Sequence, residues 1–120
     1  MLFRSLLAGA ACTLLLVPVG AAAGPAPARL QVSADEFGVA LSRSAIHGGP
    51  AIVELVNYGE DDHDLALRRV GGTRTYRIGI VHPGNTAKLE TRLRAGRFIL
   101  WCTLADHRAR GMRATLRVTS

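Results

Sequence analysis

Most of this chain is built of short runs in which apolar and polar residues alternate. The clearest run, 86–93, places Leu89 and Leu93 on one face and Lys88 and Glu90 on the other. A period of two with one apolar face is the pattern of antiparallel strands that pack on a core. No segment has a convincing helical period. The sequence therefore predicts an all-β fold.

Glycine, proline and other turn residues divide the alternating part into about eight strands, as in a β-sandwich. The expected strands are 30–33, 37–42, 51–57, 63–70, 76–80, 86–93, 97–102 and 112–119. Turns are expected at 47–50 and 82–85, where glycine and proline cluster. This spacing predicts one domain, a single antiparallel Greek-key β-sandwich.

The N-terminal residues have a different composition. Arg4 provides a basic head, 6–19 is apolar, and the small residues 20–23 follow. This order is typical of a secretory signal peptide. The apolar stretch is shorter than the roughly 20 residues that cross a bilayer. An uncleaved anchor is the alternative.

The expected organisation has three parts. They are a signal peptide at 1–23, a short leader at 24–28 and the β domain at 29–120. We therefore expect an exported protein, either periplasmic or at the cell surface, with no stable membrane span after cleavage.

The charge balance is basic. The chain has 15 basic and 9 acidic residues, and loss of Arg4 leaves 14 against 9, a net charge of +5. This balance favours an acidic partner or an anionic membrane surface. The arginines are scattered at strand-like spacing, aromatic residues are few and no recognition helix is visible, so we expect no nucleic-acid partner.

Three side chains that bind soft metals occur in one segment near the C-terminus: Cys102, His107 and Met112. Cys102 ends an expected strand in phase with Leu100, and Met112 begins the next in phase with Leu116. Alternate residues of a strand share a face, so both sulfurs are expected to point inward at the same end of the sandwich. The intervening loop can then fold back and place His107 beside the thiolate.

The cysteine count also points to a metal. Removal of the signal peptide with Cys12 leaves Cys102 alone in an oxidising compartment, where it cannot form an internal disulfide. A metal or simple burial would protect this thiol. The candidate for a fourth ligand is His63, which opens its strand after a polar loop. His47 and His82 are the competitors, and both lie in expected turns.

This candidate set suits copper better than other metals. Two imidazoles and a thiolate with a weak axial thioether form the blue-copper arrangement. Structural zinc usually has four cysteine or histidine ligands, and iron–sulfur clusters need more cysteines than this chain offers.

The segment 98–118 (FILWCTLADHRARGMRATLRV) resembles the copper-binding signature of small cupredoxins, the group that includes plastocyanin, azurin and rusticyanin. Four residues separate the cysteine from the histidine, and four separate the histidine from the methionine. The stretch from Asn57 to His63 resembles the region that carries the first histidine of the family, and 83–86 resembles a family turn. The resemblance covers essentially the whole mature chain.

The resemblance implies that His63, Cys102 and His107 are the equatorial ligands of one Cu(I)/Cu(II) ion and that Met112 is the axial ligand. It implies a monomeric one-electron carrier that acts between redox partner proteins and has no substrate chemistry of its own.

The resemblance also concerns residues next to the ligands. It implies that Asp64 and Thr103 tie the two ligand loops together by hydrogen bonds. Asp64 stands where asparagine is more usual, and a carboxylate there is expected to lower the reduction potential. Arg108 and Arg110 flank the expected exposed edge of His107 and are expected to steer an acidic redox partner.

Three alternatives stay open. The same ligands would serve a copper-delivery or sequestration protein. A cysteine hydrolase using Cys102 and His107 would need an oxyanion hole and a cleft, for which this small domain offers little room. A multicopper oxidase or nitrite reductase would need further copper centres, which His47 and His82 cannot build.

Overall fold

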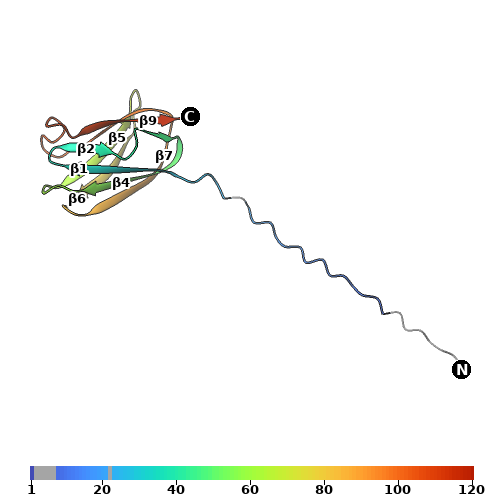
Figure 1. Ribbon diagram of the computed structural model, residues 1–120. Coiled ribbons are helices and arrows are strands. Elements are labelled where there is room, and N and C mark those ends of the chain that lie inside the picture. Colours follow the sequence, from blue (N-terminus) through green and yellow to red (C-terminus); the bar gives the residue numbers. More distant parts are fainter. Residues whose placement is uncertain (2–7, 22) are drawn as a thin grey trace.

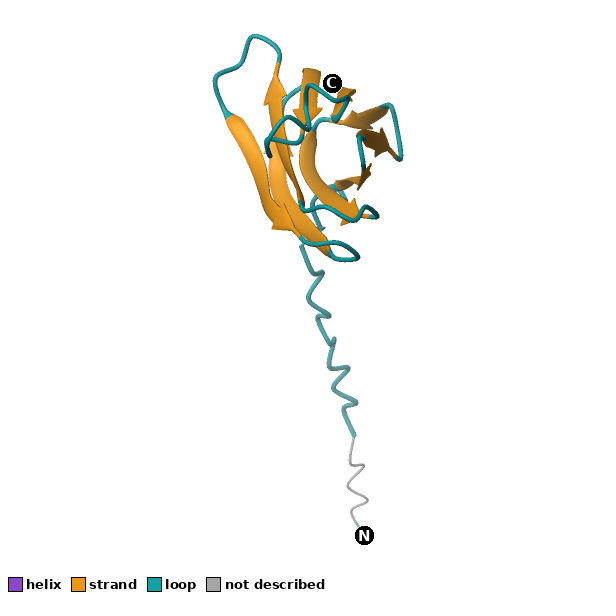
Figure 2. Cartoon of the chain, turned by 90° about the vertical axis from the view of Figure 1, so that its left-hand side faces the viewer, coloured by secondary structure: helices purple, strands orange, loops and turns teal. Residues whose placement is uncertain are grey.

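The computed structural model describes residues 1, 8–21 and 23–120, and from Ala28 onward these form nine strands in two facing sheets (Figures 1 and 2). The strands are β1 (Ala28–Asp35), β2 (Gly38–Leu41), β3 (Ala45–His47), β4 (Gly49–Asn57), β5 (His63–Arg69), β6 (Thr75–Val81), β7 (Thr86–Leu93), β8 (Gly96–Trp101) and β9 (Arg113–Thr119). One sheet has the order β2-β1-β4-β7, and the other has the order β3-β9-β8-β5-β6.

The core lies between the two sheets. Its fully buried side chains include Leu30, Val32, Val53 and Leu55 from the four-stranded sheet and Leu67, Phe98, Leu100 and Leu116 from the five-stranded sheet. Burying a side chain of this kind contributes about 1.5–3 kcal/mol. The period-two pattern therefore places the apolar residues where the sequence predicts them, and the all-β sandwich is confirmed.

The pairing is mainly antiparallel, but two pairs are parallel. β1 pairs with β4 in parallel, and β3 pairs with β9 in parallel. The parallel pairing of β1 with β4 is possible because β3 belongs to the second sheet. The chain leaves the first sheet after β2 and returns to it as β4. The alternation of apolar and polar residues does not reveal the direction of a neighbouring strand, because it is the same in parallel and antiparallel pairs.

The expected turn at 47–50 is shorter than predicted. Ala45–His47 forms a strand, Gly48 makes the crossing, and Gly49 already begins β4. The Gly48 amide donates a hydrogen bond to the Thr119 carbonyl at 2.7 Å, and a Cβ on Gly48 would lie 2.9 Å from that oxygen. The crossing therefore requires glycine at this position.

Strict alternation between the two faces fails at the end of β6. His63 pairs with Val81 and Leu65 pairs with Ile78, so β6 has one extra residue opposite β5. This bulge makes Ile78 and Val81 both face the core and leaves Ile80 57% exposed. Bulges are frequent next to functional sites, and this one lies beside His63.

The described residues before β1 lie outside the sandwich (Figures 1 and 2). Residues 8–21 and 23–26 are exposed. No helix among the described residues is long and apolar enough to cross a membrane. The predicted basic head at Arg4 and Ala22 of the predicted small-residue run lie outside the described residues, so the signal peptide stays a prediction.

Candidate metal centre

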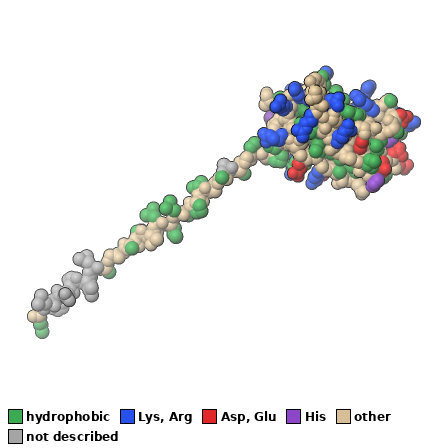
Figure 3. All heavy atoms as spheres, turned by 180° about the vertical axis from the view of Figure 1, so that it is seen from behind, with side chains coloured by type: hydrophobic (Ala, Val, Ile, Leu, Met, Phe, Trp, Pro, Cys, Tyr) green, Lys and Arg blue, Asp and Glu red, His purple; other side chains and the backbone are tan. Residues whose placement is uncertain are grey.

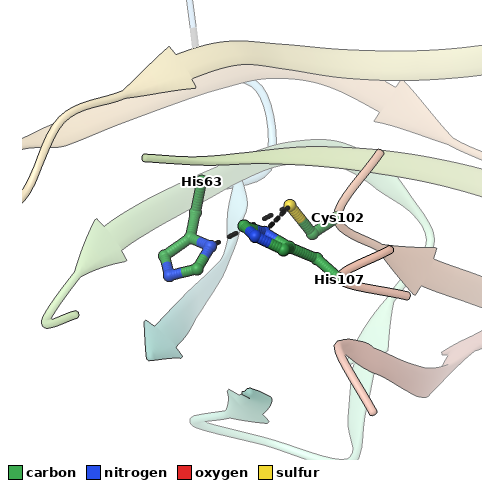
Figure 4. Close-up of side chains that lie close together, drawn as sticks. All are labelled: His63, Cys102 and His107. Atoms are coloured by element: carbon green, nitrogen blue, oxygen red, sulfur yellow. Dashed lines mark hydrogen bonds between the residues drawn. The ribbon is translucent and has the colours of Figure 1, made fainter. Parts of the chain in front are cut away.

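Three predicted ligands meet at one end of the sandwich (Figure 4). His63 is the first residue of β5, and Cys102 directly follows β8, the neighbouring strand. His107 lies in the loop between β8 and β9. His63 and Cys102 are fully buried, and His107 is 8% exposed. The three side chains therefore converge in the interior, with one imidazole at its edge.

The donor atoms are close enough to share one ion. Cys102 Sγ lies 3.5 Å from His107 Nδ1 and 4.0 Å from His63 Nδ1. All three ligand atoms lie within 4.8 Å of one another. Atoms bound about 2.0–2.3 Å from a common ion lie roughly 3.5–4 Å apart. Two imidazole nitrogens and one sulfur at this spacing fit copper.

Met112 lies beside these residues and is fully buried. Its amide donates to the His107 carbonyl at 3.0 Å, and the Cys102 amide donates to the Met112 carbonyl at 3.1 Å. These bonds fold the loop back on itself, as the sequence predicts. The role of Met112 as the axial ligand stays a prediction.

The competing histidines lie outside this cluster. His47 ends β3 at the other end of the sandwich, where its Nδ1 lies 3.2 Å from Thr119 Oγ1. His82 is exposed, and its Nδ1 lies 2.7 Å from a carboxylate oxygen of Asp62. His63 is therefore the histidine that joins Cys102 and His107.

Two hydrogen bonds link the ligand loops. Asp64 accepts one from the Thr103 amide at 2.6 Å and another from the Thr103 hydroxyl. The link confirms the tie that the resemblance implies. It connects the residue after His63 to the residue after Cys102, and so fixes the two ligands relative to each other.

Asn57 organises the loop between β4 and β5 from within. Its side chain is fully buried. Its amide group donates to the carbonyls of Asp61 at 2.7 Å and Val81 at 2.8 Å, and its oxygen accepts from the Gly59 amide at 2.9 Å. All polar atoms of this side chain thus have partners, and the chain enters His63 in one conformation.

The structure adds Glu36, which sequence reasoning missed. It lies between β1 and β2, and its carboxylate oxygen is 2.8 Å from His63 Nε2. Hydrogen bonds from the amides of Asp61 and Glu60 lower the pKa of Glu36 to about 2, with His63 adding to the effect. An acidic residue in a turn carries no signal of this contact, because 27 positions separate it from His63.

The pKa of the Cys102 thiol is shifted in the opposite direction to that of Glu36. Burial raises the pKa of Cys102 above its ordinary value. A buried neutral thiol is a poor nucleophile, because the thiolate is the reactive form. A bound cation would favour that thiolate, so the site is suited to a metal rather than to nucleophilic chemistry.

One aromatic ring packs against His107, and the two arginines that follow it in the loop lie over aromatic rings. The Phe37 ring centroid lies 5.2 Å from that of His107. The Arg110 guanidinium lies 4.6 Å from the Phe37 ring centroid, and Arg108 lies 4.6 Å from that of Trp101. Such stacking holds arginine side chains against the surface.

Comparisons with family models and with curated proteins find no match. Solved structures do match. Reduced auracyanin from the photosynthetic bacterium Roseiflexus castenholzii is 14% identical, with a TM-score of 0.64 over 80% of this chain and 100% of its own. Auracyanin A, a "blue" copper protein from the green thermophilic photosynthetic bacterium Chloroflexus aurantiacus, is 12% identical, with a TM-score of 0.63 over 78% of this chain and 100% of its own.

A multicopper oxidase also matches, at 19% identity and a TM-score of 0.55, over 75% of this chain but only 41% of its own. Identities this low establish the fold alone. The chain has the cupredoxin fold, and the predicted resemblance is confirmed at that level.

Proposed function

We propose that this chain is a type 1, or blue, copper protein that carries one electron between redox partners. The observation that carries the proposal is the buried cluster in which Cys102 Sγ lies 4.0 Å from His63 Nδ1 and 3.5 Å from His107 Nδ1. The cupredoxin fold, shared with an auracyanin that is a "blue" copper protein, supports it.

His63, Cys102 and His107 would hold the ion, and Met112 would add a weak thioether ligand. Copper would supply a one-electron change between Cu(I) and Cu(II). The residues themselves keep the ligands in place in both states: the Asp64–Thr103 bonds tie the loops, and burial of His63 and Cys102 excludes water. A set that satisfies both oxidation states reorganises little when an electron moves.

The exposed edge of His107 is the proposed point of electron entry and exit. The Phe37 ring packs against His107, and Arg110 lies over the Phe37 ring. Arg108, the residue after His107, lies over Trp101. Arg110 is bonded to Asp106 at 2.8 Å, which also lowers the pKa of Asp106. The charge of Arg110 is thus largely balanced, and Arg108 would contribute most to steering an acidic partner.

We further propose an exported, monomeric protein.

Two alternatives fit the geometry less well. A delivery protein must release its metal, yet two of the three clustered ligands are fully buried. A cysteine hydrolase needs an accessible thiolate, and Cys102 is buried with a raised pKa. The multicopper oxidase is matched over less than half of its length, and we propose no enzymatic role for this domain.

The test is a visible absorption spectrum of the full chain after one equivalent of Cu(II). We expect an intense blue band from thiolate-to-copper charge transfer. Cys102→Ser should abolish it, and Cys12→Ser, the matched control, should leave it unchanged. A colourless wild-type protein, or a blue Cys102→Ser variant, would contradict the proposal.

A further inference from the structure

The buried imidazole of His63 faces two different environments. Its Nδ1 points to Cys102 Sγ at 4.0 Å, and its Nε2 lies 2.8 Å from the Glu36 carboxylate. Glu36 reaches it from the turn between β1 and β2, which belong to the other sheet. Since His63 is fully buried, each of its nitrogens depends on these protein partners rather than on water.

The carboxylate of Glu36 is held in place by the loop that leads to His63. It accepts hydrogen bonds from the Glu60 amide at 3.0 Å and the Asp61 amide at 2.8 Å. Its side chain is 25% exposed. A Cβ on Gly59 would overlap the carboxylate, so the glycine leaves room for this approach. The position of Glu36 is therefore defined by two amide groups of one loop and by the space that Gly59 leaves.

Both carboxylate oxygens of Glu36 already accept hydrogen bonds from backbone amides, so they act as acceptors. The nitrogen facing it must then carry the proton, which leaves the lone pair on Nδ1, the nitrogen that faces Cys102 and His107. A carboxylate behind a metal-bound histidine also makes the imidazole a stronger donor, and loss of such a partner typically costs 10–100-fold in metal affinity.

We propose that Glu36 is a positioning residue: it fixes His63 as the Nε2–H tautomer and strengthens Nδ1 as a ligand, which favours Cu(II) over Cu(I) and lowers the reduction potential. The effect on copper rests on the proposed function. The effect on the tautomer does not, because it concerns the metal-free protein.

The first test is ¹⁵N NMR of the metal-free chain with labelled histidine. The ring-nitrogen shifts distinguish the two tautomers, and the chain has only four histidines. We expect the Nε2–H tautomer in the wild type. Glu36→Gln should keep it, because the glutamine oxygen can still accept the bond. Glu36→Ala should give a mixture, and Gly59→Ala, which displaces the carboxylate without removing it, should do the same.

The second test compares reduction potentials of the copper-loaded protein. Glu36→Gln should shift the ratio of Cu(II) to Cu(I) affinity about tenfold toward Cu(I), a rise of ~59 mV for one electron. Glu60→Gln is the matched control, because it removes a neighbouring charge that makes no bond to His63. Glu60→Gln should shift this affinity ratio less than threefold, because salt in the solvent screens the charge that it removes.

Three results would overturn the proposal: an Nδ1–H tautomer in the wild type, an unchanged tautomer in both Glu36→Ala and Gly59→Ala, or equal shifts in Glu36→Gln and Glu60→Gln. Failure of the wild type to take up copper would instead refute the proposed function, and the NMR result would still decide the role of Glu36.

Discussion

The two ends of this sandwich use charge differently. The metal end comprises the loops 35–38, 57–63 and 102–112 together with Asp64, and the arginine end is the opposite one, where the N-terminal segment enters. On the face drawn in Figure 3, most acidic side chains lie toward the end away from that segment, and basic side chains spread over the rest of the face. Seven of the nine acidic residues belong to the metal end: Asp35, Glu36, Glu60, Asp61, Asp62, Asp64 and Asp106.

The arginine end has shallow hollows lined by basic side chains. The arginines that line them are Arg29, Arg43, Arg69, Arg74, Arg92 and Arg94. None of the residues described as lining these hollows is acidic. Among the described residues, the basic excess is therefore concentrated far from the candidate copper, although the basic balance of the sequence is the reason for expecting an acidic partner. Composition gives the sign of the charge but not its location.

The two ends also differ in how their polar and charged side chains interact with the rest of the protein. At the metal end, the carboxylates of Glu36 and Asp64 accept hydrogen bonds from backbone amides, and the Asn57 side chain donates to backbone carbonyls. No buried side-chain nitrogen or oxygen among the described residues lacks a partner. Such short-range bonds position ligands. At the arginine end the charges are largely solvated, and they act mainly through the long-range field.

The largest expected difference between the ends concerns stability. Asn57→Ala removes three hydrogen bonds and takes the donor from the buried Val81 carbonyl, so it should lower the free energy of unfolding by about 2–4 kcal/mol. Arg94→Ala at the arginine end should change it by less than ~0.5 kcal/mol. Urea unfolding of the metal-free protein measures both. Asn85→Ala, an exposed asparagine, is the matched control, and a loss as large as that of Asn57→Ala would break the comparison.

Met112→Leu separates ligation from packing at the metal end. The two side chains have similar volumes, so the metal-free variant should lose less than ~1.5 kcal/mol. If Met112 is the axial ligand, the copper form should stay blue while its potential rises by about 60 mV, a tenfold change in relative affinity. Cyclic voltammetry measures this shift. An unchanged potential would assign Met112 to the core alone.

Asp64→Asn tests the charge of the bond between the ligand loops. Asparagine can keep the bond from the Thr103 amide but removes the negative charge, so the reduction potential should rise. The rise should be less than ~60 mV, the shift that corresponds to a tenfold change in the ratio of Cu(II) to Cu(I) affinity. Thr103→Ala removes one bond and retains the charge, and it should shift the potential less. A potential that did not rise in Asp64→Asn would show that this carboxylate does not lower it.

The smallest expected effect is on association. The nine residues of β4 extend about 30 Å along the sandwich, roughly three Debye lengths at 0.1 M salt. Arg108→Gln should therefore slow reduction or oxidation by a small anionic reagent a few-fold at low salt, and Arg94→Gln should leave the rate nearly unchanged. Stopped-flow rates at increasing salt provide the measurement. Equal slowing by both variants would mean that net charge, rather than local charge, controls the encounter.

The sequence by itself determined the features that depend on local spacing. Alternation placed Leu100, Cys102 and Leu116 on the buried face, because successive residues of a strand point to opposite sides. The two gaps of four residues from Cys102 to Met112 allowed one loop to bring His107 beside the thiolate. Residue order was sufficient here, because the contacts lie within one strand–loop–strand unit.

Only the tertiary structure decided the contacts between distant loops. The bond from Glu36 to His63 joins opposite sheets, the β6 bulge turns Ile80 outward, and the arginines gather at one end only through strand direction. Each depends on register and chain crossings, which many residues fix together. A side chain in a turn has no periodic pattern of its own, so its partner becomes known only when the sheets are assembled.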